Sequence, residues 1–215
     1  MKRTFFILLV TLITVTGFSQ NERYVNAMKK NIAEIDSAMV KGDLPKLTDI
    51  AASFERIGNA EKNQWLPFYY AAYCKVTQAF MKNEPERNDP IADQVDKLLN
   101  KADSLEMKNS EVSLLRAMNT SLRMLVDPMQ RWQQYGPIVQ QYSKDAIAQD
   151  ATNPRPYWFS GVSLKNTPEQ FGGGCGTAKP QLDKALELFE SFKPASELHP
   201  NWGKETCERE AKDCE

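Results

Sequence analysis

The sequence predicts an all-α fold in which amphipathic helices pack as antiparallel pairs. Apolar residues recur at steps of three and four through successive segments, and Gly or Pro interrupts these segments at short intervals. No stretch of useful length alternates apolar with polar residues, so a sheet has no support. Small residues stand where helices have to approach closely, at Ala146, Gly161, Ala178 and Ala185.

Residues 1–19 have the features of a secretory signal peptide. Lys2 and Arg3 precede an apolar run that begins at Phe5, is too short for a secure membrane span and ends in small residues. The alternative is an uncleaved anchor. We expect a protein that is exported to the periplasm, starts near Gln20 and has no membrane span after cleavage.

The first half of the remaining chain contains four expected helices. We place them at residues 21–41, 44–57, 65–80 and 89–105, with Gly42 and Gly58 ending the first two. The third is the most aromatic, and Pro67 is tolerable in its first turn. An aromatic stripe at helical spacing is more typical of a core than of a cofactor site.

The second half is more often interrupted by Gly and Pro. A helix is expected from Ser110 to Val126, and Asp127-Pro128 then restarts the chain with a short helical turn that presents Trp132 and Tyr135. Further helices are expected from Pro137, from Pro156 to Lys165, from Thr177 (as N-cap) to Phe192, and over residues 202–214. Residues 193–215 should form a C-terminal capping segment.

The pattern resembles tetratricopeptide repeats, whose two-helix unit carries an aromatic residue and Gly on its first helix and small residues on its second. The matching positions are Ala146, Tyr157, Gly161, Leu164, Ala178, Leu182 and Ala185. The resemblance implies a right-handed stack of about four antiparallel helix pairs that forms one domain over residues 20–215. The combination of FGGG, FKPAS and HPNWG also looks like a family of small exported bacterial proteins of unknown role.

The repeat is degenerate. Ala102 to Ala146 spans 44 residues and Ala146 to Ala185 spans 39, against about 34 in a regular unit. We assign the surplus to loops inserted at DPMQRWQQYG and NTPEQFGGGCG.

Stacked helix pairs create a concave face that commonly binds peptides, so the leading interpretation is a non-catalytic protein-interaction scaffold. Its candidate contacts with a protein or peptide partner are Arg155, Trp158, Lys165, Asn166 and Phe171. Trp158 is either such a contact or core. The alternative is a periplasmic protein that binds a small ligand beside the glycine-rich loop 171–177.

The sequence lacks the residues that nucleic-acid binding, a metal site or a phosphate-binding loop would require. Without Lys2 and Arg3 the 27 basic residues become 25 against 28 acidic ones, so nothing attracts nucleic acid. The single histidine, His199, and the absence of C-x-x-C spacing argue against a metal site. A phosphate-binding loop requires a Lys directly before its Ser or Thr, but here Gly176 precedes Thr177. We expect no cofactor, and an enzyme that uses Cys175 or His199 ranks last.

The four cysteines of an exported chain suggest a disulfide. Cys207 and Cys214 lie seven residues apart on an expected helix, roughly 10 Å by helical rise, which is too far for a bridge. Cys74 belongs to an earlier helix pair. We therefore expect Cys175 to pair with Cys214 or, failing that, with Cys207.

Overall fold

The computed structural model of the chain is all α-helical. It describes the backbone of residues 2–215 and the side chains of residues 22–215, and this part of the chain holds nine α-helices and no strand. The helices are α1 (Lys2–Lys41), α2 (Leu44–Glu61), α3 (Leu66–Lys82), α4 (Asn88–Leu105), α5 (Ser110–Leu125), α6 (Pro128–Gln149), α7 (Pro154–Lys165), α8 (Cys175–Ser191) and α9 (Lys204–Lys212). Two single 3₁₀ turns, Pro85–Arg87 and Glu169–Phe171, lie in the connections.

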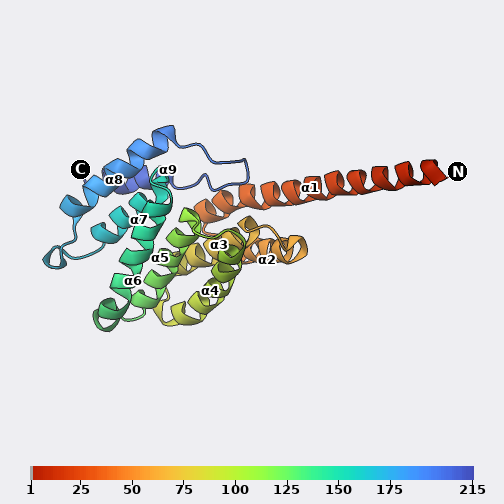
Figure 1. Ribbon diagram of the computed structural model, residues 1–215. Helices are drawn as coiled ribbons and strands as arrows, with labels where there is room; N and C mark the ends of the chain where they lie inside the picture. Colours follow the sequence, from red (N-terminus) through yellow and green to blue (C-terminus); the bar gives the residue numbers. More distant parts are fainter. Residues whose placement is uncertain (1) are drawn as a thin grey trace.

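The predicted signal peptide, residues 1–19, lies outside the residues whose side chains are described. The backbone of residues 2–19 is part of α1, which extends away from the other helices in Figure 1. Among the described residues, none of the helices has the length and apolar character needed to cross a membrane.

Successive helices pack as antiparallel neighbours, and the odd-numbered helices also contact one another in the order α1, α3, α5, α7. These four helices therefore form one layer. Residues 192–203, which we call the C-terminal strap, leave the end of α8, run toward α1 and return to α9 (Figure 1). The strap crosses the layer of odd helices, because Glu197 pairs with Lys29 of α1 and the Tyr70 hydroxyl of α3 donates to the Leu198 carbonyl.

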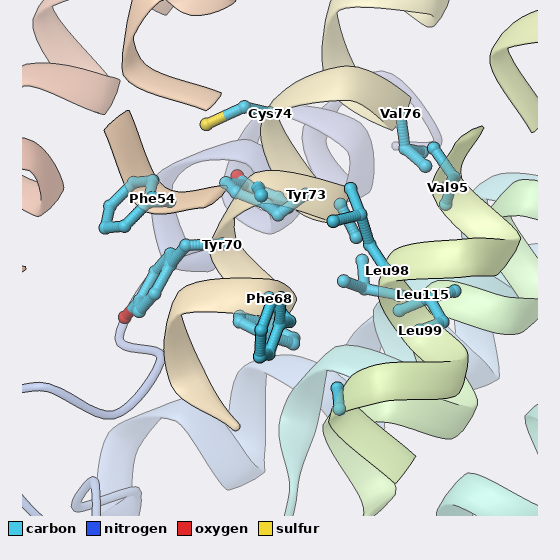
Figure 2. Packing of buried hydrophobic residues seen from close by; sticks show 14 of the residues in the cluster. Phe54, Phe68, Tyr70, Tyr73, Cys74, Val76, Val95, Leu98, Leu99 and Leu115 are labelled. Atoms are coloured by element: carbon cyan, nitrogen blue, oxygen red, sulfur yellow. The ribbon is translucent and has the colours of Figure 1, made fainter. Parts of the chain in front are cut away.

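The core is centred on α3, most of whose residues are buried. Figure 2 shows the Tyr70 ring beside Phe54 of α2, and the two rings stack with centroids 5.1 Å apart. On the other side of α3, Leu99 and Leu115 bring α4 and α5 into the same cluster. The expectation that the aromatic stripe is core is confirmed.

The expected break before Pro137 is wrong, because α6 is a single helix in which Pro137 is an interior residue. An interior proline removes one backbone hydrogen bond, but both ends of α6 are well held. The Asp127 carboxylate caps the first turn by accepting from the Gln130 N–H at 3.2 Å, and Ser113 of α5 donates to Gln149 in the last turn. DPMQRWQQYG is therefore helix rather than an inserted loop.

Two expected helix ends also moved. Gly58 lies inside α2, where a Cβ atom would stand 2.8 Å from the Phe68 ring, so the glycine serves close packing instead of ending the helix. Thr177 lies inside α8, and the preceding cap is Gly174, whose φ of +88° favours glycine. The Thr177 hydroxyl donates to the Gly174 carbonyl instead of capping a backbone N–H.

Candidate ligand-binding site

A cavity of about 660 Å³ lies beneath the strap, beside the first residues of α5 and α7. Its walls come from Trp65, from the turn before α5, from the turn before α7 and from strap residues 192–195 and 199–200. Its volume is within the range of small-molecule sites.

Two asparagine caps begin α5 and α7 at this cavity. The Asn109 side chain accepts from the backbone N–H of Glu111 at 2.9 Å, and the Asn153 side chain accepts from that of Arg155 at 3.1 Å. In both helices the cap thus places a charged side chain two residues later at the same end of the layer.

Those two charged side chains form a buried ion pair in the cavity wall. The Arg155 side chain is 1% exposed, and its Nε donates to Glu111 Oε1 at 2.8 Å. Asn153 donates to the same oxygen at 2.7 Å, and the Tyr69 hydroxyl donates to Glu111 Oε2 at 2.9 Å. Burial alone would lower the pKa of Arg155, but the charge of Glu111, its hydrogen bond to the guanidinium and the nearby Tyr69 and Tyr70 together raise that pKa.

The strap closes this network through Trp202. The Trp202 indole N–H donates to the Tyr69 hydroxyl at 2.9 Å, and the Trp202 carbonyl accepts from Arg155 Nη1 at 3.3 Å. The indole also stacks on Tyr73, with ring centroids 4.5 Å apart. The strap is therefore bonded to α3 and α7 by buried polar groups and by an aromatic stack.

The rim of the cavity combines aromatic rings with positive charge. Trp65 and Phe192 supply the rings, while Lys108 and Lys193 are exposed and have no carboxylate partner among residues 22–215. Glu106 and Asp150 also reach the rim, but Asp150 is engaged by the Thr152 hydroxyl at 2.6 Å. His199 lines the same cavity from the strap.

No family model and no curated protein matches this chain. The solved structure of the HusA haemophore from Porphyromonas gingivalis does match, with a TM-score of 0.80 and 32% sequence identity. The alignment covers 89% of this chain and 92% of that chain. The chain belongs to the HusA family. Since no tetratricopeptide model matches, that resemblance remains a prediction.

In this HusA-family chain the five candidate contact residues are not brought together. Arg155 is buried against Glu111, so it is not available as an exposed contact. Trp158 is half-buried and packs edge-on against Trp202, with centroids 5.6 Å apart. Lys165 is bonded to Glu210 and Asp213 in the C-terminal cap.

The other two candidates, Asn166 and Phe171, are exposed near the glycine-rich loop. This loop joins the end of α7 to the start of α8, whereas the cavity lies beside the start of α7 and the end of α8. The cavity of the HusA-family chain is thus at the opposite end of this helix pair from the loop 171–177.

The expected disulfide is confirmed, since Cys175 is bonded to Cys214. Cys74 and Cys207 are buried free thiols, and burial raises the pKa of each to about 12. Neither is a thiolate at neutral pH. In the part of the HusA-family chain that is described, no three His, Cys, Asp or Glu side chains come together as a metal-binding group.

Sequence reasoning missed the roles of Glu111, Lys108 and Trp202. One signal was available, because Asn109-Ser110-Glu111 and Asn153-Pro154-Arg155 each place a capping residue two positions before a charge. Glu111 and Arg155 have opposite charges and occupy equivalent positions at the starts of α5 and α7. This arrangement predicts that the two side chains pair. Trp202 was expected at the start of the last helix, whereas α9 begins at Lys204, and no local pattern indicated that Trp202 packs on α3.

Proposed function

We propose that this protein is an exported, non-catalytic haem-binding protein, and that the cavity beneath the strap is its haem site. The observation that carries the proposal is 32% identity to a haemophore over 89% of this chain and 92% of the other. It favours the small-ligand interpretation over the interaction scaffold. We place the site at the strap instead of beside the glycine-rich loop, because the cavity lies there.

The cavity suits the chemistry of haem. Haem is a flat aromatic ring system with two carboxylates, and Trp65 and Phe192 offer aromatic walls to such a ring. Lys108 and Lys193 offer two cations that are not engaged by carboxylates of the described chain. A carboxylate gains most from a cation that has no competing partner.

The strap covers the layer formed by α1, α3, α5 and α7, which disfavours the interpretation as a protein-interaction scaffold. Leu198 is buried, and Trp202 packs on Tyr73 and Trp158, so the strap already occupies the face on which a peptide would lie. The proposal also includes a right-handed stacking of the helix pairs, which the tetratricopeptide resemblance implies.

The compartment follows from two further points. A disulfide persists in oxidising compartments, and Cys175–Cys214 is formed. The signal-like residues 1–19 then favour the periplasm as the destination.

Titration of the purified chain 20–215 with haem, followed by absorption spectroscopy, tests the proposal. We expect saturable binding with a dissociation constant of roughly micromolar or tighter. Lys108→Ala/Lys193→Ala should weaken it by about two- to tenfold, because each exposed pair contributes little.

A matched control removes the same charge elsewhere. Lys97 and Lys144 are exposed on α4 and α6 and do not line the cavity. Lys97→Ala/Lys144→Ala should leave the affinity unchanged. Equal loss in both double variants would contradict the cavity as the site, and no saturable binding by the unaltered chain would contradict the function.

A further inference from the structure

A second cavity, of about 350 Å³, lies between the ends of α2 and α4. Its walls come from the end of α2 with its cap Lys62, from Phe68 of α3 and from the last turns of α4. It shares no lining residue with the cavity beneath the strap. Its volume is at the lower end of the range for small-molecule sites, so it suits a ligand much smaller than haem.

Positive charge dominates this second cavity. Lys62 and Lys101 line it, no Asp or Glu lines it, and neither lysine has a carboxylate partner among residues 22–215. Helices α2 and α4 both end here, and each helix end carries about half a negative charge. Two full positive charges exceed the sum of these two partial ones, so the cavity favours an anion.

The Lys101 ammonium is positioned by two contacts. It lies 5.0 Å from the centroid of the Phe68 ring and donates to the Asn59 side chain at 3.1 Å. Gly58 makes this arrangement possible, because a Cβ atom there would stand 2.8 Å from the same ring. An ammonium has three N–H donors, and Asn59 takes one of them. The remaining donors are available to a ligand, and little side-chain freedom is lost when the ligand binds.

The lining also has an apolar part. Leu105 ends α4, lines the cavity and is 37% exposed, and Phe68 adds an aromatic ring to the lining. A bare inorganic anion would engage the lysines but leave Leu105 in water. An uncharged apolar molecule would cover Leu105 but leave both lysines without a partner. The two features together select a ligand that has an anionic group and an apolar body.

We propose that the cavity between α2 and α4 binds a small carboxylate that has an aromatic or branched apolar body. The carboxylate lies between Lys62 and Lys101, and the apolar body covers Leu105. Binding is non-covalent. This inference does not rest on the proposed function, because different residues line the two cavities.

Benzoate is a suitable probe, because it combines a carboxylate with a flat apolar ring. Two-dimensional ¹H–¹⁵N NMR of the chain 20–215 should show saturable shifts at the amides of residues 58–62 and 101–105, with a dissociation constant of roughly millimolar or tighter. Benzyl alcohol lacks the charge and inorganic phosphate lacks the apolar body. Each should bind at least about fivefold more weakly than benzoate.

Lysine variants test the two cations. Lys62 caps α2 with a φ of +61°, so Lys62→Asn removes the charge with a residue that tolerates this conformation. Lys62→Asn/Lys101→Gln should weaken benzoate binding by about three- to twentyfold, because each exposed pair contributes modestly. Lys97→Gln/Lys144→Gln is the matched control, since both residues are exposed and line neither cavity. The control should keep the benzoate affinity of the unaltered chain.

Four results would overturn the inference. The first is the absence of saturable shifts at residues 58–62 and 101–105, and the second is a set of shifts confined to residues 108–111 and 192–200, which would place benzoate beneath the strap. The third is equal weakening in the two double variants, which would reduce the effect to net charge. The fourth is phosphate binding as tight as that of benzoate, which would show that the apolar body is not recognised.

Discussion

The Glu111–Arg155 pair places two charges where water is excluded, which is costly unless every polar atom is satisfied. Here the carboxylate accepts from Arg155, Asn153 and Tyr69, and the guanidinium also donates to the Trp202 carbonyl. The guanidinium further lies over the Phe192 ring, 4.5 Å from its centroid. Each charge is therefore stable only in the presence of the other.

Breaking this pair from one side should be more harmful than removing it whole. Arg155→Met leaves the Glu111 carboxylate buried without its cation and should cost about 3–5 kcal/mol of unfolding free energy. Glu111→Gln/Arg155→Met should recover a substantial part of that loss. Urea unfolding of Glu111→Gln, Arg155→Met and the double variant measures the coupling, and a double variant that loses as much stability as the two single variants added together would show that the charges act independently.

Gly161 makes a closer contact than any side chain would allow. An added Cβ atom would stand 2.7 Å from the Leu182 side chain and 3.2 Å from its backbone nitrogen. Gly161→Leu should therefore overpack the α7–α8 contact and cost about 1–3 kcal/mol or more. Gly176→Leu is the matched control, because nothing lies within 4 Å of a Cβ atom there. Equal urea midpoints for the two variants would refute the close approach.

His199 should make stability depend on pH. Burial lowers its folded-state pKa below the ordinary value of 6.5, so the unfolded chain binds the proton more readily. The resulting stability is complete above about 6.5 and is lost as pH falls through the folded-state pKa. We expect the urea midpoint of the unaltered chain to fall on acidification more than that of His199→Gln. Parallel curves for the two would exclude His199 as the titrating group.

At the scale of elements, the C-terminal cap depends on few bonds. Helix α9 and the residues after it are joined to α8 by the Cys175–Cys214 disulfide, by the Lys204–Glu190 ion pair and by the Cys207 thiol, which donates to the Leu182 carbonyl. Cys175→Ser/Cys214→Ser should lower the free energy of unfolding by about 2–4 kcal/mol, as removal of a bridge across 39 residues does. Hydrogen exchange should rise first in α9. Protection of α9 equal to that of the oxidised chain would contradict this role.

Element positions followed largely from apolar periodicity and from caps. The starts of α2 and α5 were predicted at residues 44 and 110, where apolar periodicity resumes after a break, and Asp43 and Asn109 are the side chains that cap them. The predicted helix start at Pro137 was wrong. A proline removes one backbone N–H, but the sequence does not show whether tertiary contacts on either side hold the helix together. The predicted helix end at Gly58 was wrong for a related reason, because this glycine allows the close approach of Phe68 from another helix.

At the scale of the whole molecule, the candidate site was out of reach of sequence pattern. The groups that build it are distant along the chain: Glu111 and Arg155 are 44 residues apart, and Tyr69 and Trp202 are 133 apart. Periodicity describes one helix at a time, and a caps-based argument reaches only a few residues. The Cys175–Cys214 pairing was accessible because helical rise excluded the competing bridge.

Export makes a prediction for the whole molecule. Protein purified from the periplasm of an expressing bacterium should lack residues 1–19, with cleavage near Ser19–Gln20. Intact-mass measurement decides this. A mass that includes Met1 to Val15 would remove the basis for the compartment.

The strap competes with any free peptide for the face of the odd-numbered helices. It is tethered at Phe192, where α8 has ended, and again through α9, after which Cys214 is bonded back to the start of α8. A segment held this way has an effective concentration in the range of millimolar or above at its own binding face. A free peptide at micromolar concentration would have to bind that face about a thousandfold more tightly than the strap to displace it. A flat ligand that enters the cavity beside the strap faces no such competitor.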